Sequence, residues 1–96
     1  MQENSDKLVM NQRKVQLLMA IGNVVYRHRK NINKGINLFS YEFDIGNGLL
    51  SGLEKGCSDV RITTLWKIAN AFGYKFSDFI REIEKELPEN FNFYLD

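Results

Sequence analysis

The chain has very few of the residues that form covalent cross-links and metal sites. Among its 96 residues there is one cysteine, Cys57, and one histidine, His28. A single cysteine excludes an intrachain disulfide. One residue of each type is also too few for the four cysteine or histidine ligands of a structural zinc site. We therefore predict no metal and no cofactor.

Long apolar stretches are also absent. No run of about 18 apolar residues occurs, so no helix is expected to span a membrane. The first 14 residues carry charges where a signal peptide would need an apolar segment. These two absences predict a cytoplasmic protein that does not insert into a membrane.

What the chain does contain is enough apolar material for one folded domain. Hydrophobic residues make up 44% of the sequence and charged residues 26%, with a net charge of only +1. This balance excludes a disordered tail and a strongly basic protein that coats nucleic acid. The charge is nevertheless uneven, because residues 1–34 are predominantly basic and residues 75–96 are predominantly acidic.

Apolar residues recur every three or four positions through most of the chain, which predicts an all-α fold. Gly56 and Gly73 are typical of helix ends, Ser77 could cap the last helix, and Pro88 would end it. Five helices are predicted, at about residues 11–29, 36–43, 47–55, 62–72 and 77–87. We predict a flexible N-terminal segment at 1–10, a helix-turn-helix domain at 11–87 and a C-terminal tail at 88–96.

The second and third predicted helices, joined by about three residues, have the outline of a helix-turn-helix. Longer motifs accompany them: Gly22 and Arg29, Phe39-Ser40, Leu50-Ser51-x-Leu53-Glu54-Lys55-Gly56, and the run from Thr64 to Gly73, TLWKIANAFG. With these motifs, the stretch from Ile21 to Ile80 resembles the phage repressor and Cro-like helix-turn-helix family, the XRE type. The resemblance implies a five-helix repressor-like DNA-binding domain with its helix-turn-helix at helices 2–3.

The resemblance also implies a role for two charged residues. In that family the arginine of the first helix pairs with the glutamate near the end of the third, which here implies Arg29 with Glu54. A charge that faces a core must be paired, because breaking a buried pair costs about 3–5 kcal/mol. We interpret these two residues as a structural ion pair and not as DNA contacts.

One face of the third predicted helix is left over for a ligand. At about 100° per residue, Leu49, Leu50 and Leu53 share one side and must meet the core. In the family the opposite arc lies in the DNA major groove. The candidate DNA-binding residues are Asn47, Gly48, Ser51, Gly52 and Lys55 on that arc, Ile36 and Asn37 at the start of the second helix, and Arg61 in the following loop.

These candidates have different expected partners. The amide of Asn47 could pair with adenine through two hydrogen bonds. Ser51 could contact a base or a phosphate, and Lys55 a phosphate. Backbone N–H groups around Ile36 and Asn37 could hold another phosphate at the positive end of the helix dipole.

The sequence departs from the family at three positions of this surface. Family members commonly have serine or threonine at position 35, glutamine at 36 and a long polar residue at 52, where this chain has Gly35, Ile36 and Gly52. Gly48 and Gly52 inside one helix cost about 2 kcal/mol relative to alanine. Either the helix backbone closely approaches DNA or a partner helix, or the module no longer reads DNA.

Other polar residues have simpler interpretations. His28 lies in a basic run at the end of the first helix and would complement the helix dipole. Glu82 and Glu86 would form a solvated helix face. No catalytic constellation is evident, so the protein is not expected to be an enzyme.

We therefore predict a sequence-specific DNA-binding transcriptional regulator that inserts residues 47–55 into the major groove of double-stranded DNA as a homodimer. The alternative is a protein-interaction module, such as an antitoxin-like or adaptor protein, with weak or lost DNA binding. A regulator of restriction–modification genes would share the same fold and size. The aromatic tail at 91–96 would either bind a protein partner or fold back onto the fifth predicted helix.

Overall fold

Helices account for most of the computed structural model, which describes the backbone of residues 2–94 and the side chains of residues 7–94. Over this range the fold is all-α and has no strand. Its helices are α1 (Gln2–Asn31), α2 (Ile36–Phe43), α3 (Asn47–Glu54), α4 (Ile62–Ala71) and α5 (Phe76–Lys85). The predicted fold class and number of helices are confirmed.

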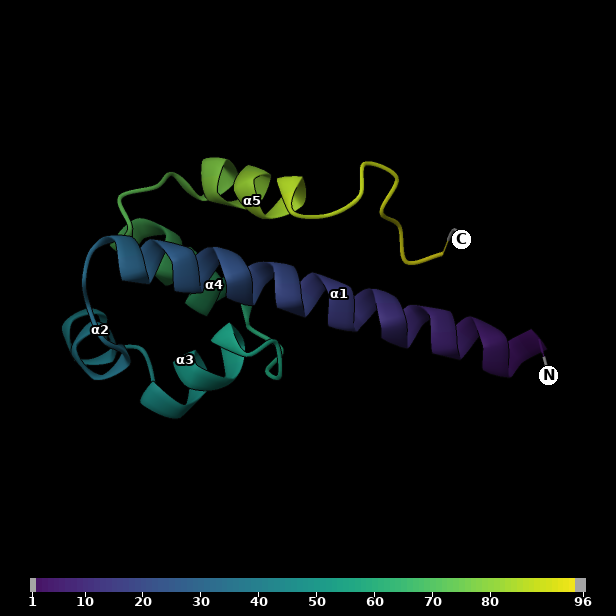
Figure 1. Ribbon diagram of the computed structural model, residues 1–96, viewed down its shortest axis with the longest axis horizontal. Coiled ribbons are helices and arrows are strands. Elements are labelled where there is room, and N and C mark those ends of the chain that lie inside the picture. Colours follow the sequence, from purple (N-terminus) through teal and green to yellow (C-terminus); the bar gives the residue numbers. More distant parts are fainter. Residues whose placement is uncertain (1, 95–96) are drawn as a thin grey trace.

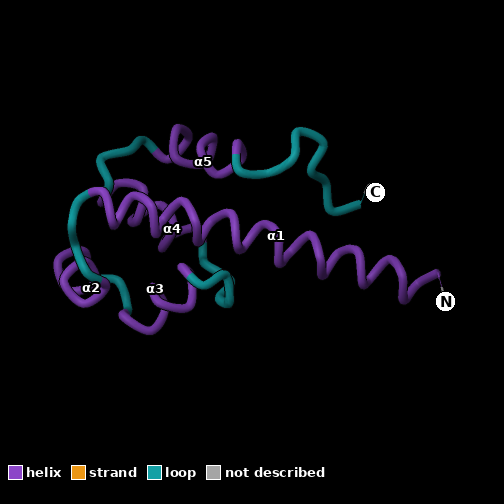
Figure 2. The backbone as a smooth tube through the Cα atoms, in the orientation of Figure 1, coloured by secondary structure: helices purple, strands orange, loops and turns teal. Residues whose placement is uncertain are grey.

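The long helix α1 organises the other four (Figures 1 and 2). Its C-terminal half contacts α3 on one side and α5 on the other, and α4 packs against α5 and α2. Its N-terminal turns extend past the other helices (Figure 1). None of the described helices is long and apolar enough to cross a bilayer.

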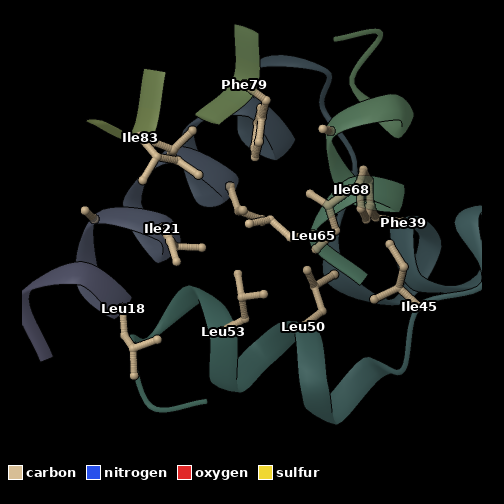
Figure 3. Close-up of a cluster of buried hydrophobic side chains, with 14 residues drawn as sticks. Leu18, Ile21, Phe39, Ile45, Leu50, Leu53, Leu65, Ile68, Phe79 and Ile83 are labelled. Atoms are coloured by element: carbon tan, nitrogen blue, oxygen red, sulfur yellow. The ribbon is translucent and has the colours of Figure 1, made fainter. Parts of the chain in front are cut away.

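All five helices contribute apolar side chains to one core (Figure 3). Phe39, Leu50, Ile68 and Phe79 are completely buried, and each comes from a different helix. Leu50 and Leu53 of α3 point into this core as the helical spacing predicts. Leu49, which was predicted to join them, is instead 37% exposed. Burial of side chains of this size stabilises the fold by about 1.5–3 kcal/mol each, so α3 is firmly anchored by one face.

Several predicted helix ends are confirmed, but α5 ends at Lys85, before the predicted end at 87 and three residues before Pro88. The bounds of α2 agree with the prediction, and α3 and α4 begin at the predicted residues, Asn47 and Ile62. Gly56 and Gly73 follow α3 and α4 with φ angles of +74° and +81°. Because side chains strain this left-handed conformation, glycine is favoured at both helix ends.

Two helix starts were predicted wrongly. Residues 2–10 continue α1, so the helix begins well before Asn11 and this part of the segment predicted as flexible is helical. No glycine or proline precedes Gly22, so nothing stops the helix from propagating from its packed part. Helix α5 begins at Phe76 after an N-cap at Lys75, which makes no side-chain cap bond, and Ser77 is therefore not the cap.

The described part of the tail folds back toward α1. Arg13 Nε donates a hydrogen bond to the backbone oxygen of Asn92 at 3.1 Å. Phe91 and Phe93 are half-buried and meet edge to face, with their ring centroids 5.7 Å apart. Tyr94 remains 84% exposed. The segment Phe91–Phe93 therefore folds back, but its hydrogen bond joins it to α1 and not to the fifth helix as predicted. The side chain of Tyr94 is exposed, and residues 95–96 lie outside the described residues.

Candidate nucleic-acid interface

A buried ion pair holds the C-terminal end of α3 on α1. Arg29 Nε and Nη2 donate to the two carboxylate oxygens of Glu54 at 2.7 and 2.8 Å. The third nitrogen, Nη1, donates to the backbone oxygen of Lys34 at 2.8 Å. The two charged side chains are only 7% and 5% exposed. The hydrogen bonds to Glu54 raise the pKa of Arg29 against the opposing effect of burial. The pair implied by the family resemblance is therefore present.

Gly22 lets the same two helices approach closely. A β-carbon at this position would lie 2.5 Å from the backbone oxygen of Leu53 and 2.8 Å from that of Glu54. No side chain can occupy this space unless the backbones move apart. The arginine and the glycine of the first-helix motif therefore both position α3.

The side of α3 that faces away from the core presents Asn47, Gly48 and Lys55 to solvent. A β-carbon at Gly48 would meet nothing within 4 Å, so this part of the helix is open for an approaching ligand. Ser51 and Gly52 are half-buried. The open surface is therefore concentrated at the two ends of α3 and is narrower in its middle than the helical spacing predicts.

Gly52 has an explanation that neither sequence interpretation included. A β-carbon there would lie 2.2 Å from the hydroxyl oxygen of Ser58, and the amide of Cys57 donates to the backbone oxygen of Gly52 at 2.9 Å. The close approach is thus made by the chain's own loop 57–59. This contact within the chain explains Gly52 without DNA, a partner helix or lost function.

The starts of α2 and α3 lie together. The side-chain amide of Asn47 donates to the side-chain oxygen of Asn37, and both residues are exposed. Ile36 packs partly against the core, so its side chain contributes to the fold. The first backbone N–H groups of α2 lack partners within the helix, as at any helix start. These N–H groups belong to Asn37, one member of the amide pair, and to its sequence neighbours.

The basic side chains of this region divide into two groups. Lys55 and Arg61 are exposed and make no ion pair among the described residues. Lys34 instead pairs with Glu42, and Lys67 donates to the backbone oxygen of Asp44 at 2.6 Å. Lys55 and Arg61 are therefore the cations most available for a phosphate. One exposed aromatic residue was missed: Tyr41 lies one turn after Asn37 and is 87% exposed.

Two residues of the basic run at the end of α1 face α5. His28 Nε2 lies 2.8 Å from a carboxylate oxygen of Glu82, and Arg27 Nη1 lies 2.6 Å from one of Glu86. The rings of Phe72, Tyr74 and Phe79 surround the imidazole, with centroids 5.0–5.9 Å away.

These contacts correct two interpretations. Glu86 is exposed and Glu82 is half-buried, but both pair with residues of α1, so they do not only face solvent. His28 does more than complement a dipole, because with Arg27 it holds α5 against α1. Burial acts to raise the pKa of Glu82, but hydrogen bonds with His28 and Tyr74, and the charges of His28 and Arg27, lower it on balance. The hydrogen bond to Glu82 raises the pKa of Tyr74 above its ordinary value.

Comparison with known proteins supports the fold assignment. The chain is similar to the crystal structure of an HTH_3 family transcriptional regulator from Vibrio cholerae, with a TM-score of 0.64 and 28% sequence identity. The similarity covers 71% of this chain and 38% of that regulator, so the chain spans well under half of its length. No protein-family model and no curated protein matches the sequence. The chain therefore has the fold of a helix-turn-helix transcriptional regulator. Separately, no metal-binding cluster occurs among its described residues.

Proposed function

We propose that this chain is a sequence-specific DNA-binding transcriptional regulator that places α3 in the major groove. The observation that carries the proposal is the arrangement of α3. One face is fixed by the core and the Arg29–Glu54 pair, while Asn47, Gly48 and Lys55 are open to solvent. A rigidly held helix with a free polar N-terminal end is the element that reads base edges in helix-turn-helix proteins.

The Asn37–Asn47 pair supports a specific way of reading a base. Asn47 uses its amide N–H₂ on Asn37, which leaves the oxygen of Asn47 and the N–H₂ of Asn37 available. Adenine offers one donor and one acceptor in the major groove. The two asparagines together supply the complementary acceptor and donor, so we infer that they recognise one adenine jointly.

Phosphate contacts would come from the edges of the same surface. Lys55 and Arg61 are exposed cations, and the N–H groups at the start of α2 can donate to a phosphate oxygen. A single domain offers few such contacts. We propose that the protein binds as a homodimer on two half-sites about 34–36 Å apart, which would double them. The proposed role is non-enzymatic, and the partner is double-stranded DNA.

Fluorescence anisotropy with the DNA upstream of its own gene, against a scrambled duplex, tests the proposal. Titrations at about 50 to about 200 mM salt separate phosphate attraction from base reading. We expect tight binding to one duplex that persists at the higher salt, with two chains bound per duplex. Weak binding to both duplexes that disappears with salt would overturn the proposal and favour the protein-interaction alternative.

Two variants assign the contacts. Asn47→Ala should reduce discrimination between the duplexes by about 1–3 kcal/mol, because one base contact is lost. Lys55→Ala should weaken both complexes about equally and reduce the salt slope by about one. Lys85→Ala on α5 removes an equal charge away from this surface and is the matched control. Unchanged discrimination in Asn47→Ala would refute the joint reading of adenine.

A further inference from the structure

Helix α4 exposes large apolar side chains that neither the core nor the proposed DNA surface uses. Its inner face buries Leu65 and Ile68, whereas Ile62 and Trp66, one turn apart, are 64% and 50% exposed. Together with Thr63, Lys67 and Asn70, these two residues line a shallow hollow of about 440 Å³. We call this surface the α4 hollow. Exposed apolar patches of this kind typically mark interaction sites.

The aromatic wall of the α4 hollow is fixed before any partner arrives. The ring of Trp66 stacks on Phe76, with the centroids 4.3 Å apart and the planes 2° from parallel. Phe76 itself packs against the core. A side chain entering the hollow would thus meet a tryptophan that has little rotational freedom left to lose, and such preorganisation favours binding.

The charges next to the α4 hollow are mostly positive. Arg61 precedes Ile62, Lys75 precedes Phe76, and all three basic residues including Lys67 are exposed. Asp44 has its backbone and carboxylate oxygens near Lys67 Nζ. The other acidic residues close in sequence, Asp59 and Asp78, pair with Lys14 and Arg81. Lys75 makes no ion pair among the described residues. The apolar hollow is therefore flanked by net positive charge.

We propose that the α4 hollow binds an acidic segment of another protein that carries one bulky apolar side chain. The apolar side chain would lie against Trp66 and Ile62, and the flanking carboxylates would meet Lys67 and Lys75. The same cations argue against a second copy of this chain, because face-to-face packing would bring like charges together. The backbone of duplex DNA offers no bulky apolar group for the hollow.

Trp66 provides the measurement, because it is the only tryptophan in the chain. The full chain is titrated with the synthetic peptide Asp-Glu-Asp-Phe-Asp-Glu-Asp while tryptophan emission is recorded. We expect a saturable shift to shorter wavelength, since the peptide covers a half-exposed indole. A peptide with serine in place of phenylalanine, and one with lysine in place of every acidic residue, should give no such shift.

Two variants and one control localise the binding. Lys75→Glu should weaken peptide binding about tenfold through charge repulsion, and Ile62→Ser should weaken it by a similar factor through loss of the apolar wall. Both positions are exposed, so the fold should be retained, and circular dichroism verifies this. Lys85→Glu makes the same charge change on α5 and should leave the affinity within about twofold.

Four outcomes would overturn the proposal. The first is no shift with the acidic phenylalanine peptide, and the second is an equal shift with the basic peptide. The third is the same shift on raising the protein concentration alone, which would identify a second copy as the occupant. The fourth is tighter binding of a single-stranded oligonucleotide, which would identify a nucleic-acid site. None of these outcomes depends on whether α3 reads DNA.

Discussion

The C-terminal end of α1 contacts two helices through charged residues, and the two contacts differ in their burial. Toward α3, Arg29 and Glu54 form a two-bond pair with almost no solvent exposure. Toward α5, Arg27 and His28 meet Glu82 and Glu86 in a partly exposed contact, in which the side chains of Arg27 and His28 are 47% and 16% exposed. Neighbouring residues of one helix turn thus make one buried contact and one partly exposed contact.

The contacts of α1 with α3 and with α5 therefore have different roles. A buried pair fixes geometry, because neither partner has water as a substitute when the other moves. A partly exposed pair is screened by water and salt, so it contributes less to the free energy of unfolding. The pairs on the α5 side help to keep α5 in place. The buried contact, between Arg29 and Glu54, is the one that orients α3, the helix that we propose reads DNA. Substitutions on the α3 side should therefore have larger effects than substitutions on the α5 side.

Removing Arg29 should give the largest effect. Arg29→Met leaves Glu54 charged and buried without its partner, and we expect a loss of about 3–5 kcal/mol in the free energy of unfolding. Urea denaturation measures it. The double variant with Glu54→Leu should recover much of the loss, because no buried charge remains. A loss below about 1 kcal/mol in the single variant would show that water reaches this contact.

The close approach of α1 and α3 at Gly22 should give the next largest effect. Gly22→Ala forces a methyl group against the backbone oxygens of Leu53 and Glu54, and overpacking of this kind costs about 1–3 kcal/mol. Gly48→Ala is the matched control in open space and should stabilise α3 by about 0.5–1 kcal/mol. Thermal unfolding of both variants measures the contrast, and equal shifts of the same sign would contradict it.

Local signals explain what could be predicted from the sequence. The burial of Leu50 and Leu53 was predicted from their spacing, and two helix ends were predicted from Gly56 and Gly73. Both kinds of signal depend only on residues close in the sequence, and the structure agrees with these predictions. The pairing of Arg29 with Glu54 was predicted from the motif resemblance. Of the candidate DNA-binding surface, the positions of Asn47 and Lys55 on an exposed face of α3 could be predicted.

Contacts between distant residues were not predictable in this way. His28 and Glu82 are 54 positions apart, and no periodicity within either helix indicates that they meet. The approach of Ser58 to Gly52 depends on how the loop after α3 folds back. The extension of α1 to Gln2 was missed because polar residues without a glycine or proline allow a helix without requiring one.

The α5 side supplies the smallest effect and the one that depends on pH. Glu82→Gln removes the charge that His28 and Arg27 contact, and we expect a loss of about 1 kcal/mol near neutral pH, because the site is partly exposed. The folded state lowers the pKa of Glu82 from its ordinary value of 4.5. Its contribution is therefore present above about pH 4.5 and disappears as the pH falls through the lowered pKa.

Urea denaturation of wild type and Glu82→Gln from about pH 3 to about pH 6 measures this dependence. The two curves of unfolding free energy should be separated at the upper end and converge at the lower end, since a protonated Glu82 has also lost its charge. A gap for Glu82→Gln that stays constant down to pH 3 would mean that packing of the side chain, and not its charge, holds α5 against α1.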